Sequence, residues 1–441
     1  MLRILAAVGC AWAQQPGVHV EEFHPEMPLW TCDSSGCSKE TKSIVLDANW
    51  RWLHNGEYTN CYKDGDFDKS LCPDPLTCAQ NCHLEGNSEK QYKSTYGIKA
   101  ANKGIGMGFV TETEYGANYG SRVYMLDGPD KYKLFKLKNR EFTLTVDMFY
   151  MPCGLNGAVY FVEMDADGGK AAAAQTGGIN DAGAKYGTGY CDAQCPHDIK
   201  FMAGKANSGW NSSHDPPIGK YGACCAEMDI WEANSRATAY TPHPCSITGT
   251  YVCEGVDCGD NSKDERYDGV CDKDGNRDDG DLIDIRRFYV QDGKVIPNSN
   301  VSIAGITGNS VTDKICAEMK TAFGDIDDFN RKGGLKVMGE ALDRGMVLVM
   351  SLWDDAEANM LWLDSDYPLD KDPSTPGVDR GPCRTDTGKP PYLRKKYPNA
   401  RIKYSEIKVG TIGSTFRKQD DEDDEDDGIW DDDRRLEEVH I

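Results

Sequence analysis

The chain has 441 residues, a formal net charge of −23 at pH 7 and 39% hydrophobic residues. Such a surplus of acidic side chains repels phosphate groups, which argues against nucleic acid as a partner and suits an uncharged polymer such as a polysaccharide. The 46 glycines and 20 prolines are typical of a turn-rich, mostly β protein.

Residues 1–13 have the pattern of a secretory signal peptide. Arg3 supplies the positive end, Ile4–Val8 form the apolar stretch, and Ala11-Trp12-Ala13 match a small-x-small cleavage site. No other apolar run is long enough to span a bilayer, so no membrane is expected as a partner.

A secreted chain with 18 cysteines is expected to form disulfides. The alternative is a cytosolic protein with reduced thiols. The sequences that begin at Asn211 and Asn300 match the N-glycosylation pattern, which predicts that both lie on the surface.

Two tryptophans, Trp50 and Trp52, follow a predicted strand at Ile44–Leu46. In an extended strand both rings point to one face. They can belong to the core, or they can form a platform on which the apolar faces of sugar rings stack. The residues alone leave both interpretations open.

Strand patterns recur along the rest of the chain. Residues 141–149 alternate between apolar and polar side chains, and the nearly continuous apolar run Met346–Trp353 is typical of a strand buried on both sides. The other predicted strands are 122–126, 158–164 and 402–409, the last with an irregularity near Ser405. Cys316–Phe323 is the best candidate for a helix. This pattern predicts an antiparallel β-sandwich.

Three carboxylates, Glu227, Asp229 and Glu232, lie within six residues in the stretch Cys224–Asn234. Alternation with apolar residues predicts a strand whose wet face carries the first two acids. Glu232 then points to the other face, unless one extra residue near Ile230 or Trp231 forms a bulge and brings it back.

Three acids on one face suit a retaining glycosidase. Crowding raises the pKa of at least one carboxyl, so that one acid stays protonated while its neighbour acts as a nucleophile. Such enzymes hold their two working carboxyls about 5–5.5 Å apart. An exposed acidic strand and a calcium site are alternatives that the spacing leaves open.

The domain is expected to end near Thr415, so that residues 14–415 form one domain. Asp420–Asp427 are eight consecutive acids, and Asp431–Asp433 follow. Such a block repels itself, so residues 416–441 are predicted to be an acidic disordered tail. The tail would either lack a function, associate with calcium or aid solubility.

The string E-M-D-I-W-E-A-N resembles the catalytic signature of glycoside hydrolase family 7, the cellobiohydrolases and endoglucanases that act on cellulose. The resemblance covers Val18 to Thr415. Further similar strings occur in order: L-D-A-N-W-R-W from Leu46, P-C-G-L-N-G-A from Pro152, G-T-G-Y-C-D-A-Q-C-P from Gly187, T-P-H-P-C from Thr241, S-L-W-D-D from Ser351 and N-M-L-W-L-D-S from Asn359.

This resemblance implies an all-β fold, a concanavalin-like jelly-roll β-sandwich in which long loops form a substrate tunnel. Residues 14–415 would be the catalytic domain of a secreted, monomeric retaining enzyme. Its partner would be cellulose or a related β-1,4-glucan, with no cofactor and no metal.

The resemblance also implies a role for each acid. Glu227 would be the nucleophile, and Glu232 the acid that protonates the departing oxygen and then the base that activates water. Asp229 would hydrogen-bond Glu227 and keep it oriented and ionised.

Further positions are implied to bind substrate. Trp353 and Trp362 would stack glucose rings on either side of the scissile bond, and the other tryptophans would stack them in distant subsites. For the arginines, a surface salt bridge is the alternative. The implied residues are Trp50, Trp52, Arg122, Asn156, Tyr160, Asp192, Gln194, His243, Arg266, Trp353, Trp362 and Arg380.

Two loops bear on the mode of attack. Cys253–Cys271 resembles the tunnel-roofing loop of the family's cellobiohydrolases, and the Phe323–Lys332 loop is retained. They favour an enzyme that releases cellobiose processively from chain ends. The alternatives are an endo-β-1,4-glucanase of the same family and a non-catalytic carbohydrate-binding protein.

The chain departs from the family after Gly275. The short connection Asn276–Ile285 stands where family members have a longer segment with a core strand. Either Leu282–Ile285 partly substitutes for that strand, or the connection reflects a faulty gene model, or the protein is a variant that lacks a core strand and folds poorly. A damaged fold would favour the non-catalytic alternative.

The cysteines agree with this loss. Removal of Cys10 with the signal leaves an odd number, 17, and Cys316 is left over because its usual partner falls in the missing segment. We expect Cys316 to remain a thiol that can link dimers. The family pattern implies the pairs Cys32–Cys37, Cys61–Cys82, Cys72–Cys78, Cys153–Cys383, Cys191–Cys225, Cys195–Cys224, Cys245–Cys271 and Cys253–Cys258.

Overall fold

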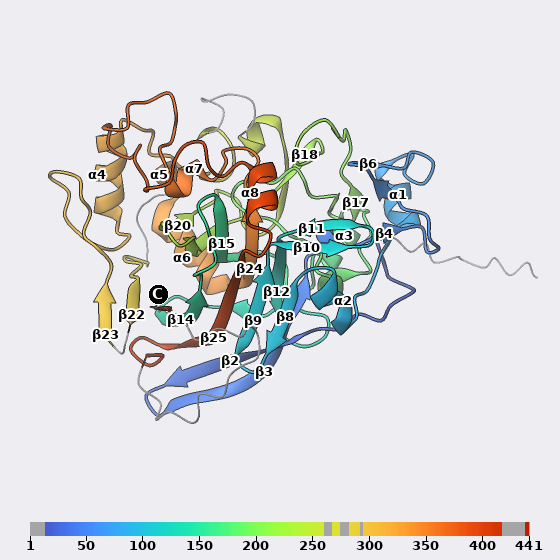
Figure 1. Cartoon of the computed structure of the whole chain (residues 1–441), viewed down its shortest axis with the longest axis horizontal. Coiled ribbons are helices and arrows are strands. Elements are labelled where there is room, and N and C mark those ends of the chain that lie inside the picture. The colour runs from blue at the N-terminus through green and yellow to red at the C-terminus, as the bar shows by residue number, and fades with distance from the viewer. Residues whose placement is uncertain (1–13, 260–266, 274–281, 292–293, 417–436, 441) are drawn as a thin grey trace, which may run out of the picture.

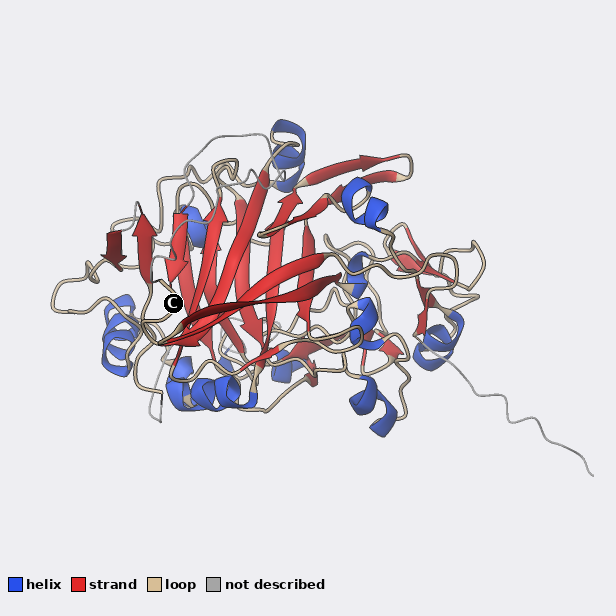
Figure 2. Cartoon of the chain, turned by 90° about the horizontal axis from the view of Figure 1, so that it is seen from below, coloured by secondary structure: helices blue, strands red, loops and turns tan. Residues whose placement is uncertain are grey.

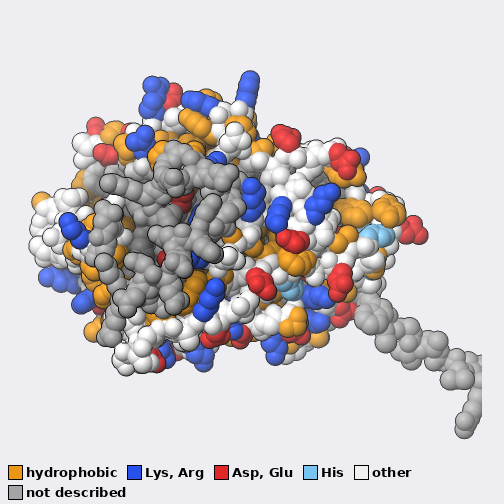
Figure 3. Space-filling model, turned by 60° about the horizontal axis from the view of Figure 1, so that its bottom comes forward, with side chains coloured by type: hydrophobic (Ala, Val, Ile, Leu, Met, Phe, Trp, Pro, Cys, Tyr) orange, Lys and Arg blue, Asp and Glu red, His pale blue; other side chains and the backbone are white. Residues whose placement is uncertain are grey.

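A computed structural model of the chain describes residues 14–259, 267–273, 282–291, 294–416 and 437–440. The predicted signal peptide lies outside these residues. Within them, no helix is long and apolar enough to cross a membrane. Among the described residues, acidic and basic side chains are interspersed on the face in Figure 3.

One large sheet of 15 strands dominates the described structure (Figures 1 and 2). Its strands pair in the order β20-β19-β15-β24-β12-β3-β2-β25-β14-β26-β22-β23, while β13 pairs with β24, β9 with β25, and β8 with β9. Its members are β2 (Glu26–Asp33), β3 (Gly36–Leu46), β8 (Ile98–Ala101), β9 (Gly104–Gly108), β12 (Ser121–Leu126), β13 (Leu134–Phe135), β14 (Arg140–Asp147), β15 (Leu155–Val162), β19 (Glu227–Ala233), β20 (Thr238–His243), β22 (Phe288–Gln291), β23 (Lys294–Pro297), β24 (Met346–Asp354), β25 (Arg401–Thr411) and β26 (Glu437–His440).

Small sheets and short helices surround this sheet. The remaining strands are β1 (Gln15–Pro16), β4 (Leu53–His54), β5 (Tyr62–Lys63), β6 (Asp66–Phe67), β7 (His83–Leu84), β10 (Val110–Thr113), β11 (Gly116–Tyr119), β16 (Phe201–Met202), β17 (Lys205–Ala206), β18 (Tyr221–Cys224) and β21 (Tyr251–Glu254). The helices are α1 (Pro75–Asn81), α2 (Glu89–Ser94), α3 (Lys170–Gln175), α4 (Asp313–Phe323), α5 (Asp328–Arg331), α6 (Gly334–Arg344), α7 (Leu361–Asp364) and α8 (Pro390–Lys396), with 3-10 turns at Ala48–Trp50, Gly183–Tyr186 and Gly255–Cys258.

The sheet folds back on itself into a sandwich. The ring of Phe142 on β14 meets that of Phe161 on β15 edge to face, with centroids 5.1 Å apart. The hydroxyl of Tyr404 on β25 donates to the backbone oxygen of Ser351 on β24 at 2.9 Å. These contacts join the two layers through one core, so the predicted all-β sandwich is confirmed.

Local predictions met different outcomes. The irregularity near Ser405 is confirmed, since the pairing of β25 with β14 shifts register between Thr143 and Thr145. The helix at Cys316–Phe323 is the body of α4. The extended strand predicted through Trp50 is wrong, because Asp47 accepts a hydrogen bond from the backbone of Asn49 and caps a 3-10 turn that ends at Trp50.

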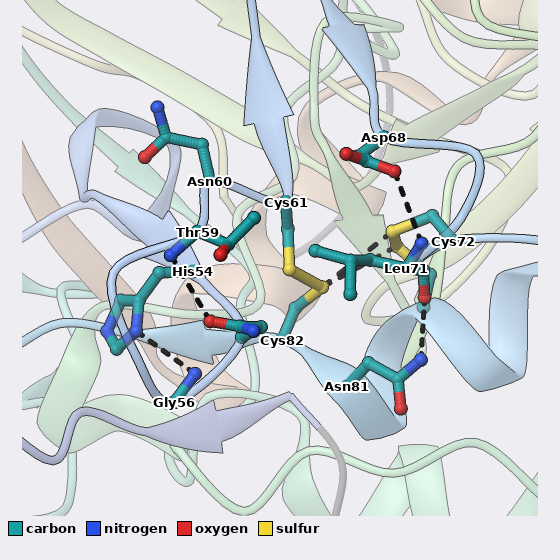
Figure 4. The surroundings of a disulfide bond; sticks show 12 residues. His54, Gly56, Thr59, Asn60, Cys61, Asp68, Leu71, Cys72, Asn81 and Cys82 are labelled. Carbon is teal, nitrogen blue, oxygen red and sulfur yellow. Dashed lines mark hydrogen bonds between the residues drawn. A yellow bond between two sulfur atoms is a disulfide. The ribbon is translucent and has the colours of Figure 1, made fainter.

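All the predicted disulfides are present in the described structure. Figure 4 shows Cys61–Cys82, which ties the loop after β4 to the end of α1. Cys316 belongs to none of these pairs and is 3% exposed, within a cluster that includes Phe329 and Leu335. A dimer linked through Cys316 therefore requires α4 to move.

The end of the chain differs from the prediction. Most of the predicted tail, residues 417–436, lies outside the described residues, but Glu437–His440 form β26 between β14 and β22. Leu282 and Ile285 pack against the core without forming a strand. The segment that stands between β14 and β22 therefore comes from the far end of the sequence.

Trp231 provides a test of the core beneath β19. Its side chain is 1% exposed, so Trp231→Ala should lower the free energy of unfolding by about 3–5 kcal/mol, because it removes a large buried side chain and leaves a cavity. Denaturant unfolding measures the change. Tyr115→Ala, at a site that is 92% exposed, is the control, and equal effects of the two changes would contradict this packing.

Candidate active site

A bulge in β19 places three acids on one face of the sheet. Opposite β15, Val159 pairs with Trp231 and Tyr160 with Asp229, so Ile230 is an extra residue. The side chains of Ile230 and Trp231 both lie in the core. Alternation therefore resumes with Glu232 on the same face as Glu227 and Asp229, and the predicted bulge is confirmed.

The neighbouring strands extend this polar face. On β15, Val159 and Phe161 belong to the main core cluster, so Asn156 and Tyr160 lie on the opposite face, which is the face of the acids. On β24, Trp353 is the register partner of Asn156. Strand alternation thus gathers side chains that are distant in the sequence.

Glu227, Asp229 and His243 form a buried chain of hydrogen bonds. The carboxyls are 6% and 5% exposed. Glu227 accepts a bond from the backbone N–H of Ala193 at 3.0 Å and shares a side-chain hydrogen bond with Asp229. Asp229 Oδ2 lies 2.9 Å from His243 Nε2.

The backbone fixes the tautomer of His243. Its Nδ1 lies 2.9 Å from the backbone oxygen of Asp272. Because a carbonyl oxygen can only accept, Nδ1 carries a hydrogen. The contact between Nε2 and Asp229 therefore needs a proton of its own, supplied either by an imidazolium ring or by a protonated Asp229.

Burial raises the pKa values of these carboxyls. For Glu227 the causes are burial, then Asp229 and Asp192, while His243 and the Ala193 amide act in the opposite direction, and the pKa lies well above its usual range. Burial and then Glu232 raise the pKa of Asp229 well above its usual range. Below neutral pH, the cluster therefore holds protons that exposed carboxyls would release.

Glu232 stands apart from this chain of hydrogen bonds. Its side chain is 9% exposed, and Asn156 Nδ2 donates to Glu232 Oε1 at 2.9 Å. Asn156 is held in turn, since its Oδ1 accepts from the Ala233 amide at 3.0 Å. Burial raises the pKa of Glu232 to about 7, although the bond from Asn156 opposes the shift.

Two disulfides hold the loop that carries Asp192, Ala193 and Gln194. Cys191–Cys225 and Cys195–Cys224 bracket the three residues. Asp192 is buried and accepts the Gln194 amide at 2.8 Å. The Gln194 side chain is exposed and donates to the backbone oxygen of Lys273 at 2.9 Å.

Tyr190 connects three of the predicted residues and was missed in the sequence. Its hydroxyl donates to Asp192 at 2.6 Å and lies 2.8 Å from the Tyr160 hydroxyl. The guanidinium of Arg122 lies 3.3 Å from the centre of its ring. The signal was present, since Tyr190 stands in the string G-T-G-Y-C.

Arg122 is part of a buried ion pair. Its Nε donates to Asp47 Oδ2 at 2.7 Å, while its Nη2 is buried without a hydrogen-bond partner. The ring of Trp50 lies 5.4 Å from the guanidinium. Arg122 therefore forms an ion pair through Nε and keeps Nη2 as a donor for a further hydrogen bond.

Trp52 lies in a group of stacked rings. Its neighbours are His54, with centroids 4.2 Å apart, and Tyr58 at 6.2 Å. Its indole N–H donates to Asn60 at 2.6 Å, and Asn60 precedes the disulfide of Cys61 (Figure 4). The tryptophan is thereby held in one orientation.

Trp353, Trp362 and Arg380 form a third group. The two indole rings are stacked with centroids 6.4 Å apart. Arg380 is exposed, and its Nη1 donates to the backbone oxygen of Trp362 at 3.3 Å. Arg266, predicted to accompany Arg380, lies outside the described residues.

One group of side chains has the composition of a metal site. In the described part of the chain, His19, His54 and Glu85 bring ligand atoms within 4.8 Å of one another. The two imidazole rings lie roughly face to face, with centroids 5.0 Å apart and planes 32° apart. His54 Nε2 already bonds Glu85, and His19 Nε2 bonds the backbone oxygen of Glu57, each at 2.8 Å, so we assign no metal to this group.

Comparisons with known proteins agree on one family. The model of Glycosyl hydrolase family 7 matches residues 16–277 and 274–416. Exoglucanase GH7B of Limnoria quadripunctata is 46% identical over 451 aligned residues, which cover 93% of this chain and 98% of the relative. The crystal structure of a GH7 family cellobiohydrolase from Daphnia pulex has a TM-score of 0.87 at 44% identity and covers 91% of this chain and 100% of its own. A cellobiohydrolase from Melanocarpus albomyces, complexed with cellotetraose, has a TM-score of 0.83 at 39% identity and covers 91% and 99% of the two chains. The chain therefore belongs to glycosyl hydrolase family 7.

Proposed function

We propose that this chain is a secreted, monomeric cellobiohydrolase, which cleaves β-1,4-glucosidic bonds of cellulose with retention and releases cellobiose processively from chain ends. The observation that carries the proposal is the bulged strand with Glu227, Asp229 and Glu232 on one face. Two of its relatives are described as cellobiohydrolases and one as an exoglucanase.

We assign the role of nucleophile to Glu227, and its hydrogen bonds are compatible with this assignment. Two contacts, from Glu227 to Asp229 and from Asp229 to His243, need two protons. In the proposed state, Asp229 is protonated, His243 is an imidazolium and Glu227 is the carboxylate, so these three buried groups are neutral overall. Asp229 then donates to Glu227, as does the amide of Ala193, and both bonds stabilise the carboxylate.

In the first step, the Glu227 carboxylate attacks the anomeric carbon and the bond to the glycosidic oxygen breaks. Glu232 gives its proton to the departing oxygen, which leaves as a hydroxyl. A pKa of about 7 keeps Glu232 protonated in weakly acidic solution.

In the second step, Glu232 acts as a base. Now a carboxylate, it takes a proton from water, and the water oxygen attacks the anomeric carbon and displaces Glu227. The donor Asn156 stabilises the charged form of Glu232 at this stage. The cycle needs no metal and no cofactor.

Three groups of side chains suit a linear glucan. Asp192, Tyr160 and Gln194 lie beside the acids, and the stacked indoles of Trp353 and Trp362 present apolar faces to glucose rings. Arg122, Trp50 and Trp52 would bind more distant glucose units, and Arg266 and Arg380 the product end.

Contacts between two loops support exo attack. Tyr267, in the Cys253–Cys271 loop, donates its hydroxyl to Asp325 at 2.8 Å, and Lys332 donates to the backbone oxygen of Tyr267 at 3.0 Å. These bonds join the Cys253–Cys271 loop to the Phe323–Lys332 loop. Two loops that together cover a bound glucan chain would need such contacts. Eight disulfides in the described residues suit an oxidising, extracellular compartment.

The roles of the two glutamates separate on a soluble aryl cellobioside with an activated leaving group. Glu232→Gln should still form the glycosyl-enzyme, because such a leaving group needs no proton, and the adduct should accumulate. On unactivated substrate the same variant should lose about 10²–10⁴-fold in kcat. Glu227→Gln should bind cellobiose but form no adduct. Intact-protein mass spectrometry detects the adduct, and its appearance on Glu227→Gln would refute the assignment.

The pKa of Glu232 predicts the alkaline limb of activity. The profile of kcat/KM should fall above about pH 7, as the acid loses its proton. Asn156→Leu removes a bond to the carboxylate and should move this limb to higher pH. A pH–rate profile on a soluble cellobioside measures both, and a shift to lower pH contradicts the contact.

The same pKa shift has a consequence for stability. Because the folded-state pKa of Glu232 is raised from its usual 4.5 to about 7, its contribution to stability is complete below pH 4.5 and decreases as the pH rises toward 7. Thermal unfolding of Glu232→Gln should lack this component of the pH dependence.

The loop contact predicts the mode of attack. Tyr267→Phe removes the hydroxyl that bonds Asp325, so internal bonds should be cleaved more often. The viscosity of a soluble cellulose derivative should then fall further per reducing end released. Tyr251→Phe is the control, because its hydroxyl bonds Asp257 at 3.1 Å, only six residues along the chain, and joins no distant loops. A wild-type protein that already lowers viscosity strongly per reducing end would indicate an endoglucanase.

A further inference from the structure

The C-terminal strand β26 completes the large sheet from within. It runs antiparallel to β14 on one side, where Val439 pairs with Leu144, and antiparallel to β22 on the other, where Val439 pairs with Tyr289. In Figure 1 the mark for the C-terminus lies beside β14 and β22. Four residues from the far end of the chain thus occupy an interior position of the sheet.

In the described structure, the hairpin of β22 and β23 joins the sheet through β26 alone. The strand order reads β14-β26-β22-β23, with no pairing between β22 and β14. Removal of β26 would leave unpaired N–H and C=O groups on β14 and on β22 at once. Such paired open edges form a slot that takes an extended segment through its main chain.

The hairpin that β26 holds lies beneath the catalytic strand. Tyr289 of β22 meets Trp231 of β19 with ring centroids 6.3 Å apart. Arg287 is buried, lies 4.4 Å from the ring centre of Tyr240 and donates to the backbone oxygen of Ala239 at 3.2 Å. The support of β19 and β20 therefore extends, through β22, to the C-terminal strand.

The length of the chain permits this arrangement. Strands β25 and β26 are both antiparallel to β14, so they run parallel to each other and need a crossover connection, for which a dozen or more residues suffice. Residues 417–436 separate Phe416 from β26. At about 3.3 Å per residue, a segment of that length can span the roughly 20 Å from one end of β14 to the other.

We propose that Glu437–His440 is a complementing strand that fills, in its own molecule, the slot between β14 and β22. The slot recognises an antiparallel segment through main-chain hydrogen bonds, and its occupant is the chain's own C-terminus. The strand holds β22 and β23 against the sheet beneath the acids. This inference does not depend on the substrate or on the catalytic roles of the acids.

Hydrogen–deuterium exchange on the intact protein tests the pairing directly. Amides of residues 438–440 should exchange at least about tenfold more slowly than in a synthetic peptide of residues 434–441. Deletion of residues 437–441 should accelerate exchange in β14 and β22 but not in β12. Peptide-like exchange of 438–440 in the intact protein would overturn the proposal.

A proline substitution tests the ladder without shortening the chain. Val439 pairs with strands on both sides, so Val439→Pro must remove a hydrogen bond and should lower the thermal midpoint and accelerate exchange in β22. Gln419→Pro, outside the strand, is the matched control and should change neither. Equal behaviour of the two variants would overturn the proposal.

The source of the strand is tested by complementation. The 434–441 peptide, carrying a fluorescent label, should bind the deletion variant, restore slow exchange in β22, and fail to bind the intact monomer. Absence of binding to the deletion variant would overturn the slot. Intact protein that elutes as a dimer, with β26 exchanged between copies, would overturn the assignment to its own molecule.

Discussion

The extra residue Ile230 is the constraint on which the catalytic face depends. Two consecutive side chains, Ile230 and Trp231, enter the core. A shift in the pairing register of β19 against β15 would expose one of them to solvent, so their burial stabilises the observed register. Without that residue, Glu232 would alternate onto the opposite face, away from Glu227. The packing of Ile230 and Trp231 in the core therefore determines that Glu232 lies on the same face of β19 as Glu227 and Asp229.

The second requirement is that buried carboxyls share protons. Glu227 and Asp229 are almost fully buried, and isolated charges there would be costly. His243 resolves the cost because Asp272 fixes its tautomer and directs Nε2 at Asp229. Glu232 lies outside this chain, and burial, together with the nearby charge of Asp192, raises its pKa. The three carboxyls thus differ in their hydrogen-bond partners and protonation because of their surroundings, more than because of their residue types.

Much of this was readable in the sequence, for physical reasons. The spacing of three acids among apolar residues indicated that a bulge could bring them together, since a regular strand would place Glu232 on the other face. Strand alternation predicted the sandwich, and ordered family strings predicted every disulfide pair. Helix α6 was missed, although Leu335, Met338 and Leu342 are buried at helical spacing.

Other features left no local signal. The turn that ends at Trp50 depends on one cap from Asp47. Tyr190 stands in a family string, but its contacts with Arg122 on β12 and Tyr160 on β15 left no signal in its own sequence neighbourhood. Strand β26 is four residues long and follows a block of acids, and its place is set only by open edges far away in the chain.

The two disulfides around Ala193 give Glu227 a covalent frame. Cys191–Cys225 and Cys195–Cys224 join the loop to the residues just before Glu227, so the distance from the Ala193 amide to that carboxylate is fixed by sulfur bonds as well as by folding. Because the bond from the Ala193 amide lowers the pKa of Glu227, reducing agents that cleave the two disulfides would loosen a contact that favours the charged form of this carboxyl.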